Sequence, residues 1–183
     1  YDPPKLKVQG MEIVRSSTPQ SVRTALKQSV GFVLTKTEDE LQEFVKDLEE
    51  KWYSLPPQDI AFPRTVNNVG KYRDANSIFK KGTPIHVRGA LLYNHLLSEK
   101  KLETKYQTLL EGDKIKFVYL KEPNPLGTNV ITFQSNIPPE FKVSEYVDYQ
   151  MMFEKAFLDP LNSLLACVGW KVKEEATLEG LFG

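Results

Sequence analysis

Two stretches near the start of the chain carry apolar residues at the three- and four-residue spacing of a helix face. Thr18 is expected to cap the first helix, with Pro19 in the first turn, where its missing N–H costs nothing. Thr37 and Glu40 form a capping-box pattern at the start of the second helix, which Pro56-Pro57 should end. The apolar faces predict an antiparallel helical pair built on Val22, Leu26, Val30 and Val33, and on Leu41, Phe44, Val45, Leu48 and Trp52.

Two more helices are predicted further along the chain. Thr83-Pro84 repeats the cap-and-proline pattern and opens the third helix. Ser144 opens the last long one, in which Pro160 predicts a kink or a restart, with Asp159 as a local cap. Gly169 then has the position of a C-terminal cap.

Strand patterns are few. Residues 114–120 alternate between lysines, expected on an open face, and apolar residues. A tight turn at 124–127 leads to a partner strand at 130–133. Residues 60–66 suggest a short strand that Pro63 confines to a sheet edge. The predicted class is α+β, a predominantly helical fold with a small antiparallel β element and a flexible C-terminal tail.

The charges change this picture, because they are segregated although the 183 residues have a net charge of zero. Residues 1–36 carry a net charge of +4 and residues 64–121 one of +7, whereas residues 37–50 carry −6 and residues 122–183 carry −5. Such blocks suggest one positive face that binds phosphates. The alternative is an ordinary mixed surface in solvent.

The composition, 40% hydrophobic and 26% charged, is that of a globular protein. No run of about 18 apolar residues predicts a membrane span. The chain opens with Tyr1 and has no signal-peptide pattern, so we expect it to be a piece of something longer.

The residues that most enzymes need are scarce. His86, His95 and Cys167 are the only histidines and cysteine, which excludes an internal disulfide and leaves little for a zinc cluster or a nucleophile pair. Phosphate-binding glycine loops and nucleophile elbows are missing too. His86 is expected to be packed or bonded to backbone, and Cys167 to lie in the core. The sequence predicts no active site, metal or cofactor in this chain.

Two basic segments are candidate binding motifs. Lys80-Lys81 stands in a polar loop over residues 67–83 that leads into a helix N-terminus, where free N–H groups favour a phosphate, and Arg88 lies one turn inside. Near the start, Lys5 and Lys7 precede a turn that leads to Arg15. The alternative for both segments is a set of solvated lysines.

Several motifs in a fixed order resemble one family. They are Pro4-Lys5-Leu6-Lys7 with Gly10-Met11-Glu12, Ser16-Ser17-Thr18-Pro19, Pro84-Ile85-His86-Val87-Arg88-Gly89 with Leu92-Tyr93, Asn124-Pro125-Leu126-Gly127, Phe153-Glu154-Lys155-Ala156-Phe157 with Pro160-Leu161, and Leu178-Glu179-Gly180-Leu181-Phe182-Gly183. Over residues 3–183 the chain resembles the thumb of T-even-type phage family B DNA polymerases. The resemblance implies a palm-to-thumb junction at 1–18, a thumb at 19–169 and a clamp-binding tail at 170–183.

The resemblance also implies which residues hold duplex DNA behind the polymerase site. The candidate DNA-binding residues are Lys5, Lys7, Arg15, Lys80, Lys81, Arg88 and Lys155. Their contacts to phosphates would fix position without reading sequence. Relatives carry lysines where this chain has Asn129 and Asp159, so we expect fewer phosphate contacts here.

The tail is the second element that the resemblance singles out. Leu178, Leu181 and Phe182 would dock on a ring-shaped sliding clamp, with an affinity on the order of micromolar. Gly180 replaces a bulkier residue of close relatives and weakens this expectation. The alternative is a tail that folds back on its own domain.

The favoured hypothesis is therefore a binding region of a phage replicative DNA polymerase, in the cytoplasm of an infected bacterial host. Its partners would be primer–template duplex, the sliding clamp, and the palm and other polymerase domains. Magnesium and the catalytic residues would lie in the missing palm, so this fragment alone should be inactive. The other hypotheses are a regulatory or structural protein-interaction domain without nucleic-acid binding and, less favoured, a small hydrolase.

Overall fold

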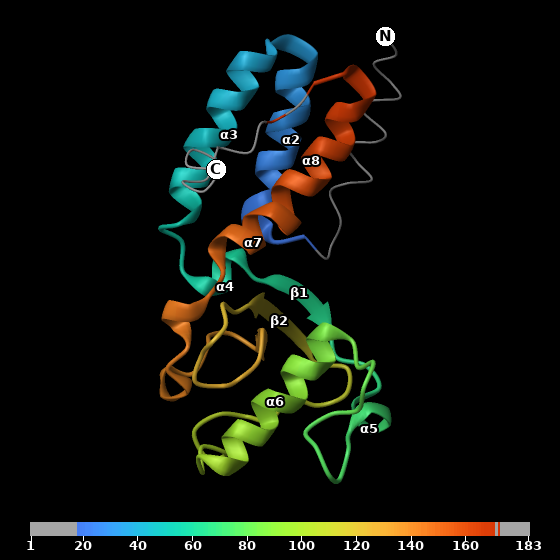
Figure 1. The fold of residues 1–183 in the computed structure, drawn as a ribbon, viewed down its shortest axis with the longest axis vertical. Coiled ribbons are helices and arrows are strands. Elements are labelled where there is room, and N and C mark those ends of the chain that lie inside the picture. Colours follow the sequence, from blue (N-terminus) through green and yellow to red (C-terminus); the bar gives the residue numbers. More distant parts are fainter. Residues whose placement is uncertain (1–17, 171, 173–183) are drawn as a thin grey trace.

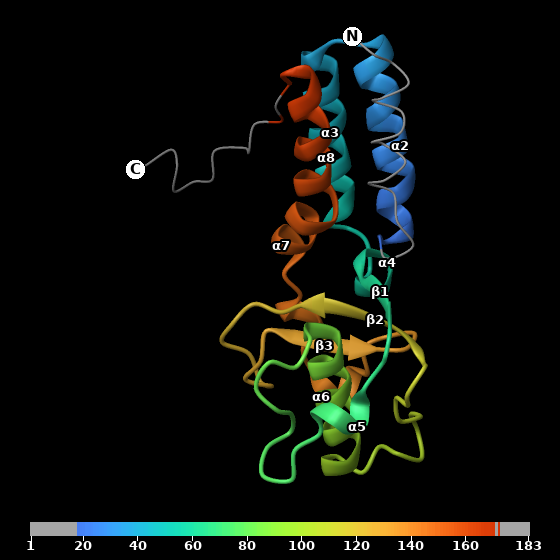
Figure 2. The same cartoon turned by 90° about the vertical axis from the view of Figure 1, so that its right-hand side faces the viewer.

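The computed structural model describes residues 18–170 and Val172, which form a helical bundle stacked on a smaller α+β part (Figures 1 and 2). The bundle consists of α2 (Gln20–Thr35), α3 (Glu38–Trp52), α7 (Tyr149–Phe153) and α8 (Asp159–Leu165). The other part holds β1 (Phe62–Thr65), β2 (Lys114–Tyr119), β3 (Val130–Phe133) and α6 (Ile85–Glu99), and two short helices, α4 (Pro57–Ile60) and α5 (Val69–Tyr72), lie between α3 and α6 in the chain. The predicted α+β class is confirmed.

The predicted pair α2 and α3 is present. Val22, Leu26 and Val33 are buried on α2, and Leu41, Val45 and Trp52 are buried on α3. The capping box is also present, since the Glu40 N–H donates to the Thr37 hydroxyl and the Thr37 N–H to the Glu40 carboxylate.

The predicted cap of α2 is wrong. Pro19, not Thr18, is the N-cap residue, and its carbonyl accepts bonds from the Val22 and Arg23 N–H groups. The extended backbone of proline (φ −54°, ψ 141°) suits the cap position itself, so the helix begins one residue later than the pattern indicates.

Trp52, the last residue of α3, links that helix to α7. Its indole Nε1 donates to the Tyr149 carbonyl at 2.9 Å, and the Tyr149 hydroxyl donates to the Leu55 carbonyl at 2.6 Å. Trp52 also packs edge-on against Phe153, 5.4 Å between ring centroids. These contacts fix where α7 enters the bundle, and α7 in turn packs against β2.

The sheet lies between the bundle and α6 (Figure 2). Its order is β1-β2-β3 and all pairs are antiparallel, with Phe62 opposite Phe117 and Phe117 opposite Thr132. The predicted hairpin and the edge position of Pro63 are confirmed. Of the lysines expected on an open face, Lys114 is exposed, whereas Lys116 is half-buried and donates to the Gln58 carbonyl of α4.

The last helix differs most from its prediction. Ser144 begins only a 3-10 turn, and α7 starts at Tyr149, where the Asp148 carboxylate accepts from the Met151 N–H. The predicted restart is present, since α8 begins at Asp159 with Pro160 in its first turn, directly after a π turn at Glu154–Leu158. Asp159 is helical (φ −62°, ψ −49°) and is therefore not a cap. Gly169, with φ of 73°, is the predicted C-terminal cap.

Two smaller predictions also fail. The polar segment 67–83 contains the short helix α5 and a bridge between Arg73 and Phe79, so it is more ordered than a plain loop. Cys167 is exposed rather than in the core, because it falls in the 3-10 turn Ala166–Val168 that ends the last helix.

No helix in the described part of the chain combines the length and apolarity that crossing a membrane requires.

Candidate nucleic-acid interface

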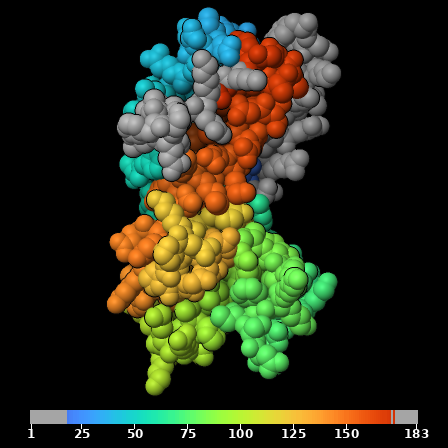
Figure 3. Space-filling view, in the orientation of Figure 1, coloured from blue at the N-terminus to red at the C-terminus, as the bar shows by residue number. Residues whose placement is uncertain are grey.

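The loop before α6 presents Lys80 and Lys81 to solvent. Its shape is set by the backbone, because the Lys80 N–H donates to the Tyr72 carbonyl at 2.9 Å and Gly82 adopts a left-handed φ of 83°. In the space-filling view this green segment forms its own bulge beside the rest of the α+β part (Figure 3).

The N-terminus of α6 follows this loop directly. Pro84 is the N-cap residue and no side chain caps the helix. Thr83 is thus not the predicted cap, because its hydroxyl donates to the Lys80 carbonyl at 2.6 Å instead. A helix start without a side-chain cap, next to two lysines, is electrostatically suited to an anion.

Arg88 lies one turn inside α6 and is half-buried. Its Nη2 donates to the Asn129 amide oxygen, and its guanidinium carbon lies 5.7 Å from the centre of the Phe79 ring. Its Nε is buried and has no hydrogen-bond partner among the described residues. Arg88 is therefore held between the loop before α6 and the residue before β3.

Lys155 reaches the same sheet from the bundle. It belongs to the π turn Glu154–Leu158, is exposed, and places its Nζ 5.3 Å from the centre of the Tyr119 ring at the end of β2. Asn129, the partner of Arg88, accepts a bond on its carbonyl from the N–H of Leu120, the next residue after Tyr119. Arg88 and Lys155, 67 residues apart in sequence, therefore approach one end of the β2–β3 hairpin.

Arg64 on β1 is a cationic residue that the sequence analysis missed. Its guanidinium carbon lies 5.5 Å from the Phe62 ring centre and 5.4 Å from that of Phe117. Burial lowers the pKa of Arg64, and the electrostatic interaction with Tyr119 raises it to a smaller extent. The signal in the sequence was the Phe62-Pro63-Arg64 edge strand, since alternation places Phe62 and Arg64 on one face.

His86 lies beside this group. It is half-buried, and its ring centre is 6.5 Å from that of Phe117. Burial lowers the pKa of His86, the nearby Arg64 charge lowers it further, and a hydrogen bond with the Thr65 backbone raises it. The prediction of a packed, backbone-bonded histidine is confirmed, and at neutral pH this imidazole adds no charge.

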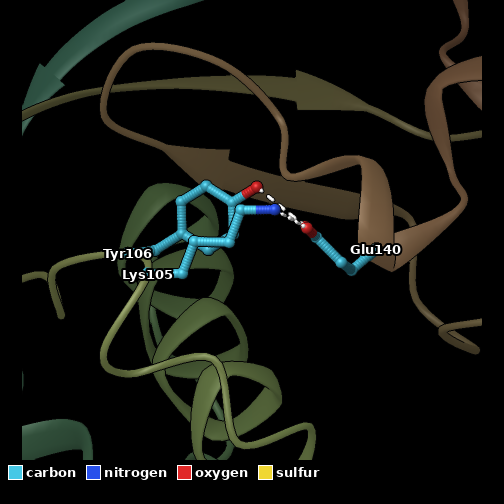
Figure 4. A network of polar contacts seen from close by, with 3 residues as sticks. All are labelled: Lys105, Tyr106 and Glu140. Atoms are coloured by element: carbon cyan, nitrogen blue, oxygen red, sulfur yellow. Dashed lines mark hydrogen bonds and ion pairs between the residues drawn. The ribbon is translucent and has the colours of Figure 1, made fainter.

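Lys105, in contrast, lies in the segment that follows α6 in the chain and belongs to a separate network of polar contacts. Its ammonium pairs with Glu140, and the Tyr106 hydroxyl donates to the same carboxylate at 2.8 Å (Figure 4). These bonds lower the pKa of Glu140 to about 2 and raise the pKa of Lys105. Lys105 therefore links the segment after α6 to the 3-10 turn at Pro139–Phe141.

Of the predicted DNA-binding residues, Lys80, Lys81, Arg88 and Lys155 fall within the described structure. The structure links Arg88 to Lys155 through the hairpin end and sets Lys80 and Lys81 in the loop that carries Phe79. The other predicted contacts lie outside the described residues, namely Lys5, Lys7 and Arg15 for DNA and Leu178, Leu181 and Phe182 for the clamp.

In residues 18–170, no three histidine, cysteine, aspartate or glutamate side chains come close enough together to hold a metal ion. The exposed acids of α3, such as Asp39, Glu43 and Asp47, stand on the helical bundle rather than at the sheet.

The described residues thus form an α+β module with cationic side chains around its small antiparallel sheet. No protein-family model matches the chain. The chain is homologous over its whole length to the DNA-directed DNA polymerases of two phages. It is 34% identical to that of Enterobacteria phage T4 over 98% of the chain, and 33% identical to that of Escherichia phage RB69 over 100% of it. It spans 20% of the length of each of these relatives.

Proposed function

We propose that this chain is the thumb region of a phage replicative DNA polymerase and that it holds the duplex product by its phosphates. The observation that carries the proposal is the approach of Arg88 and Lys155 to one hairpin end, in a chain homologous to two phage polymerases. Arg64, whose guanidinium lies over the Phe62 and Phe117 rings, adds positive potential to the same sheet.

The proposed contacts act on the sugar–phosphate backbone. Lys80 and Lys81 are exposed and compact point charges, whereas Arg88 presents a planar guanidinium suited to two phosphate oxygens. Such contacts hold the duplex in register without reading its bases. Affinity should therefore be independent of sequence and should fall with salt, by about 0.9 in log–log slope for each phosphate neutralised.

The test is a salt titration of duplex binding, in which fluorescence anisotropy measures the affinity for two labelled duplexes of unrelated sequence. We expect equal affinities for both duplexes, and Arg88→Ala and Lys155→Ala should each weaken binding and lower the slope by about one. Lys100→Ala is the matched control, because Lys100 is exposed at the opposite end of α6.

Two outcomes would overturn the proposal. One is the absence of duplex binding at low salt, which favours the alternative of a protein-interaction domain that uses the exposed acidic face of α3. The other is an equal loss on Lys100→Ala, which would show a diffuse charge effect rather than a surface at the sheet.

The remaining roles belong to the longer polymerase. We propose that the catalytic residues and magnesium ions lie in a palm outside this chain, that Lys5, Lys7 and Arg15 meet the primer–template near that palm, and that Leu178, Leu181 and Phe182 dock on the sliding clamp. The site of action would be the cytoplasm of the infected host. A purified chain that incorporated nucleotides on a primed template with magnesium would contradict this division.

A further inference from the structure

We propose that Asn129 is a positioning residue for phosphate binding, which orients the Arg88 guanidinium while leaving its charge unneutralised. This inference rests on the proposed function, because it assumes that Arg88 meets a phosphate. It concerns a residue that does not itself need to touch the nucleic acid.

The contact joins two elements whose spacing is fixed. Arg88 lies on α6, and Asn129 immediately precedes β3. The Thr132 hydroxyl of β3 donates to the His86 carbonyl at 3.0 Å, and the Cα of Gly89 packs so closely that a Cβ there would lie 2.1 Å from that hydroxyl oxygen. The helix and strand are thus held together two residues before Arg88 and one residue after it.

Asn129 is also anchored on its own strand. Its carbonyl accepts from the Leu120 N–H at 2.8 Å, which extends the β2–β3 ladder by one pair. With its backbone fixed, its amide oxygen is a stationary acceptor for Arg88 Nη2. The Phe79 ring, 5.7 Å from the guanidinium carbon, limits motion on one face of the group.

The chemical identity of the acceptor decides what the contact does. A guanidinium has five N–H donors, and an amide oxygen accepts one of them without carrying a negative charge. A carboxylate at this position would orient Arg88 as well but would cancel its charge in a charge-assisted pair. Asparagine therefore provides orientation while the full positive charge stays available to a phosphate.

The experiment compares Asn129→Ala and Asn129→Asp in the duplex-binding titration. Asn129→Asp should weaken binding about as much as Arg88→Ala, roughly tenfold, and lower the salt slope by about one, because the new carboxylate competes with the phosphate. Asn129→Ala should weaken binding less, about threefold, with a small change in slope, because the charge remains and only its orientation is lost.

Two further measurements separate positioning from mere structural support. In an Arg88→Ala background, Asn129→Ala should cause no additional loss, since its effect acts through Arg88. Asn136→Asp is the control for added negative charge, because Asn136 is exposed just past the other end of β3. It should weaken binding less than Asn129→Asp does.

The outcomes are distinguishable from failure of the proposed function. If Arg88→Ala weakens binding and both Asn129 variants bind as the parent does, the inference is wrong and the proposed function stands. If the parent chain binds no duplex, the proposed function fails first. Unfolding midpoints of all variants are measured in parallel, and if one Asn129 variant does not fold, the other and its double variant decide.

Discussion

Gly89 is the residue at which α6 comes closest to the sheet. A Cβ at this position would lie 2.1 Å from Thr132 Oγ1, and Thr132 cannot yield easily because it is buried and bonded to the His86 carbonyl. We therefore expect Gly89→Ala to lower the free energy of unfolding by about 1–3 kcal/mol, although alanine is the better helix former. Urea denaturation monitored by circular dichroism measures the change.

Gly31 provides the matched control, since it also lies inside a long helix. Among the described residues, apart from its chain neighbours and the backbone of its own helix, nothing lies within 4 Å of a Cβ built there. Gly31→Ala should raise the free energy of unfolding by about 0.5–1 kcal/mol. If both substitutions change stability in the same direction, the contact between Gly89 and Thr132 is not what limits this position.

Individual residues were predictable from sequence where the signal was local. Thr37 with Glu40 was read correctly, because both bonds of a capping box lie within four residues. Thr18 and Thr83 were assigned as caps in error, because the proline that follows each takes the cap position. Arg64 was missed because its importance comes from two aromatic rings, one of them on another strand.

At the scale of elements, α3 depends on its N-terminal cap. Thr37 accepts from the Glu40 N–H at 3.2 Å and receives the returning bond of Glu40 on its own N–H. Thr37→Ala should cost about 1 kcal/mol of unfolding free energy in urea denaturation. Thr18→Ala should cost much less, since Thr18 caps no helix, and equal losses would argue against the capping box as the cause.

The segment after α6 is held by a bond network whose strength should depend on pH. The pKa of Glu140 lies at about 2 in the folded protein, below its ordinary value of 4.5, chiefly because of Lys105 and then Tyr106. The folded state thus favours the ionised form, so the stabilisation is complete above pH 4.5 and is lost as the pH falls towards 2.

Glu140→Gln tests this dependence directly. The parent should be more stable than the variant at pH 6, and the difference should shrink between pH 4.5 and pH 2.5 in urea titrations at each pH. The same pH series on Asp74→Asn serves as a comparison. The pKa of Asp74 is also lowered, but mainly by hydrogen bonds from Asn76 and Ser77 within its own loop rather than by a bond to a distant segment. A stability difference for Glu140→Gln that stays constant with pH would contradict the assignment.

Element boundaries followed the sequence except near the end of the chain. The two hairpin strands and the starts of α2, α3 and α6 were predicted within about two residues because periodicity and turn residues agreed there, whereas α3 ends at Trp52, before the Pro56-Pro57 pair expected to end it. The last helix was not, because Ser144 opens only a 3-10 turn and α7 begins only at Tyr149. A π turn, in which the Asp159 N–H donates to the Glu154 carbonyl, joins α7 to α8 just before Pro160, and hydrophobic periodicity does not reveal such a turn.

At the scale of the whole molecule, the sequence predicted where the cations are concentrated but not how they meet. The +7 block over residues 64–121 contains Lys80, Lys81, Arg88 and Arg64. Lys155, in contrast, lies in an acidic block and joins the others only because α7 and the π turn pack beside β2. That contact depends on tertiary packing. The hydrogen bonds of Tyr149 with Trp52 and Leu55, which join segments far apart in the sequence, are part of this packing.

A chain of zero net charge offers a direct test of local against global electrostatics in duplex binding. Lys80→Ala/Lys81→Ala and Lys46→Ala/Lys51→Ala each remove two exposed lysines, and both pairs change the net charge by the same amount. The first pair lies before the N-terminus of α6 and the second on α3 among acidic residues. If binding depends on the surface around the sheet, the first variant should lower the salt slope by about two and the second should leave it nearly unchanged. Equal slopes for the two variants would mean that the net charge governs binding, and the phosphate-binding surface would then lose its electrostatic basis.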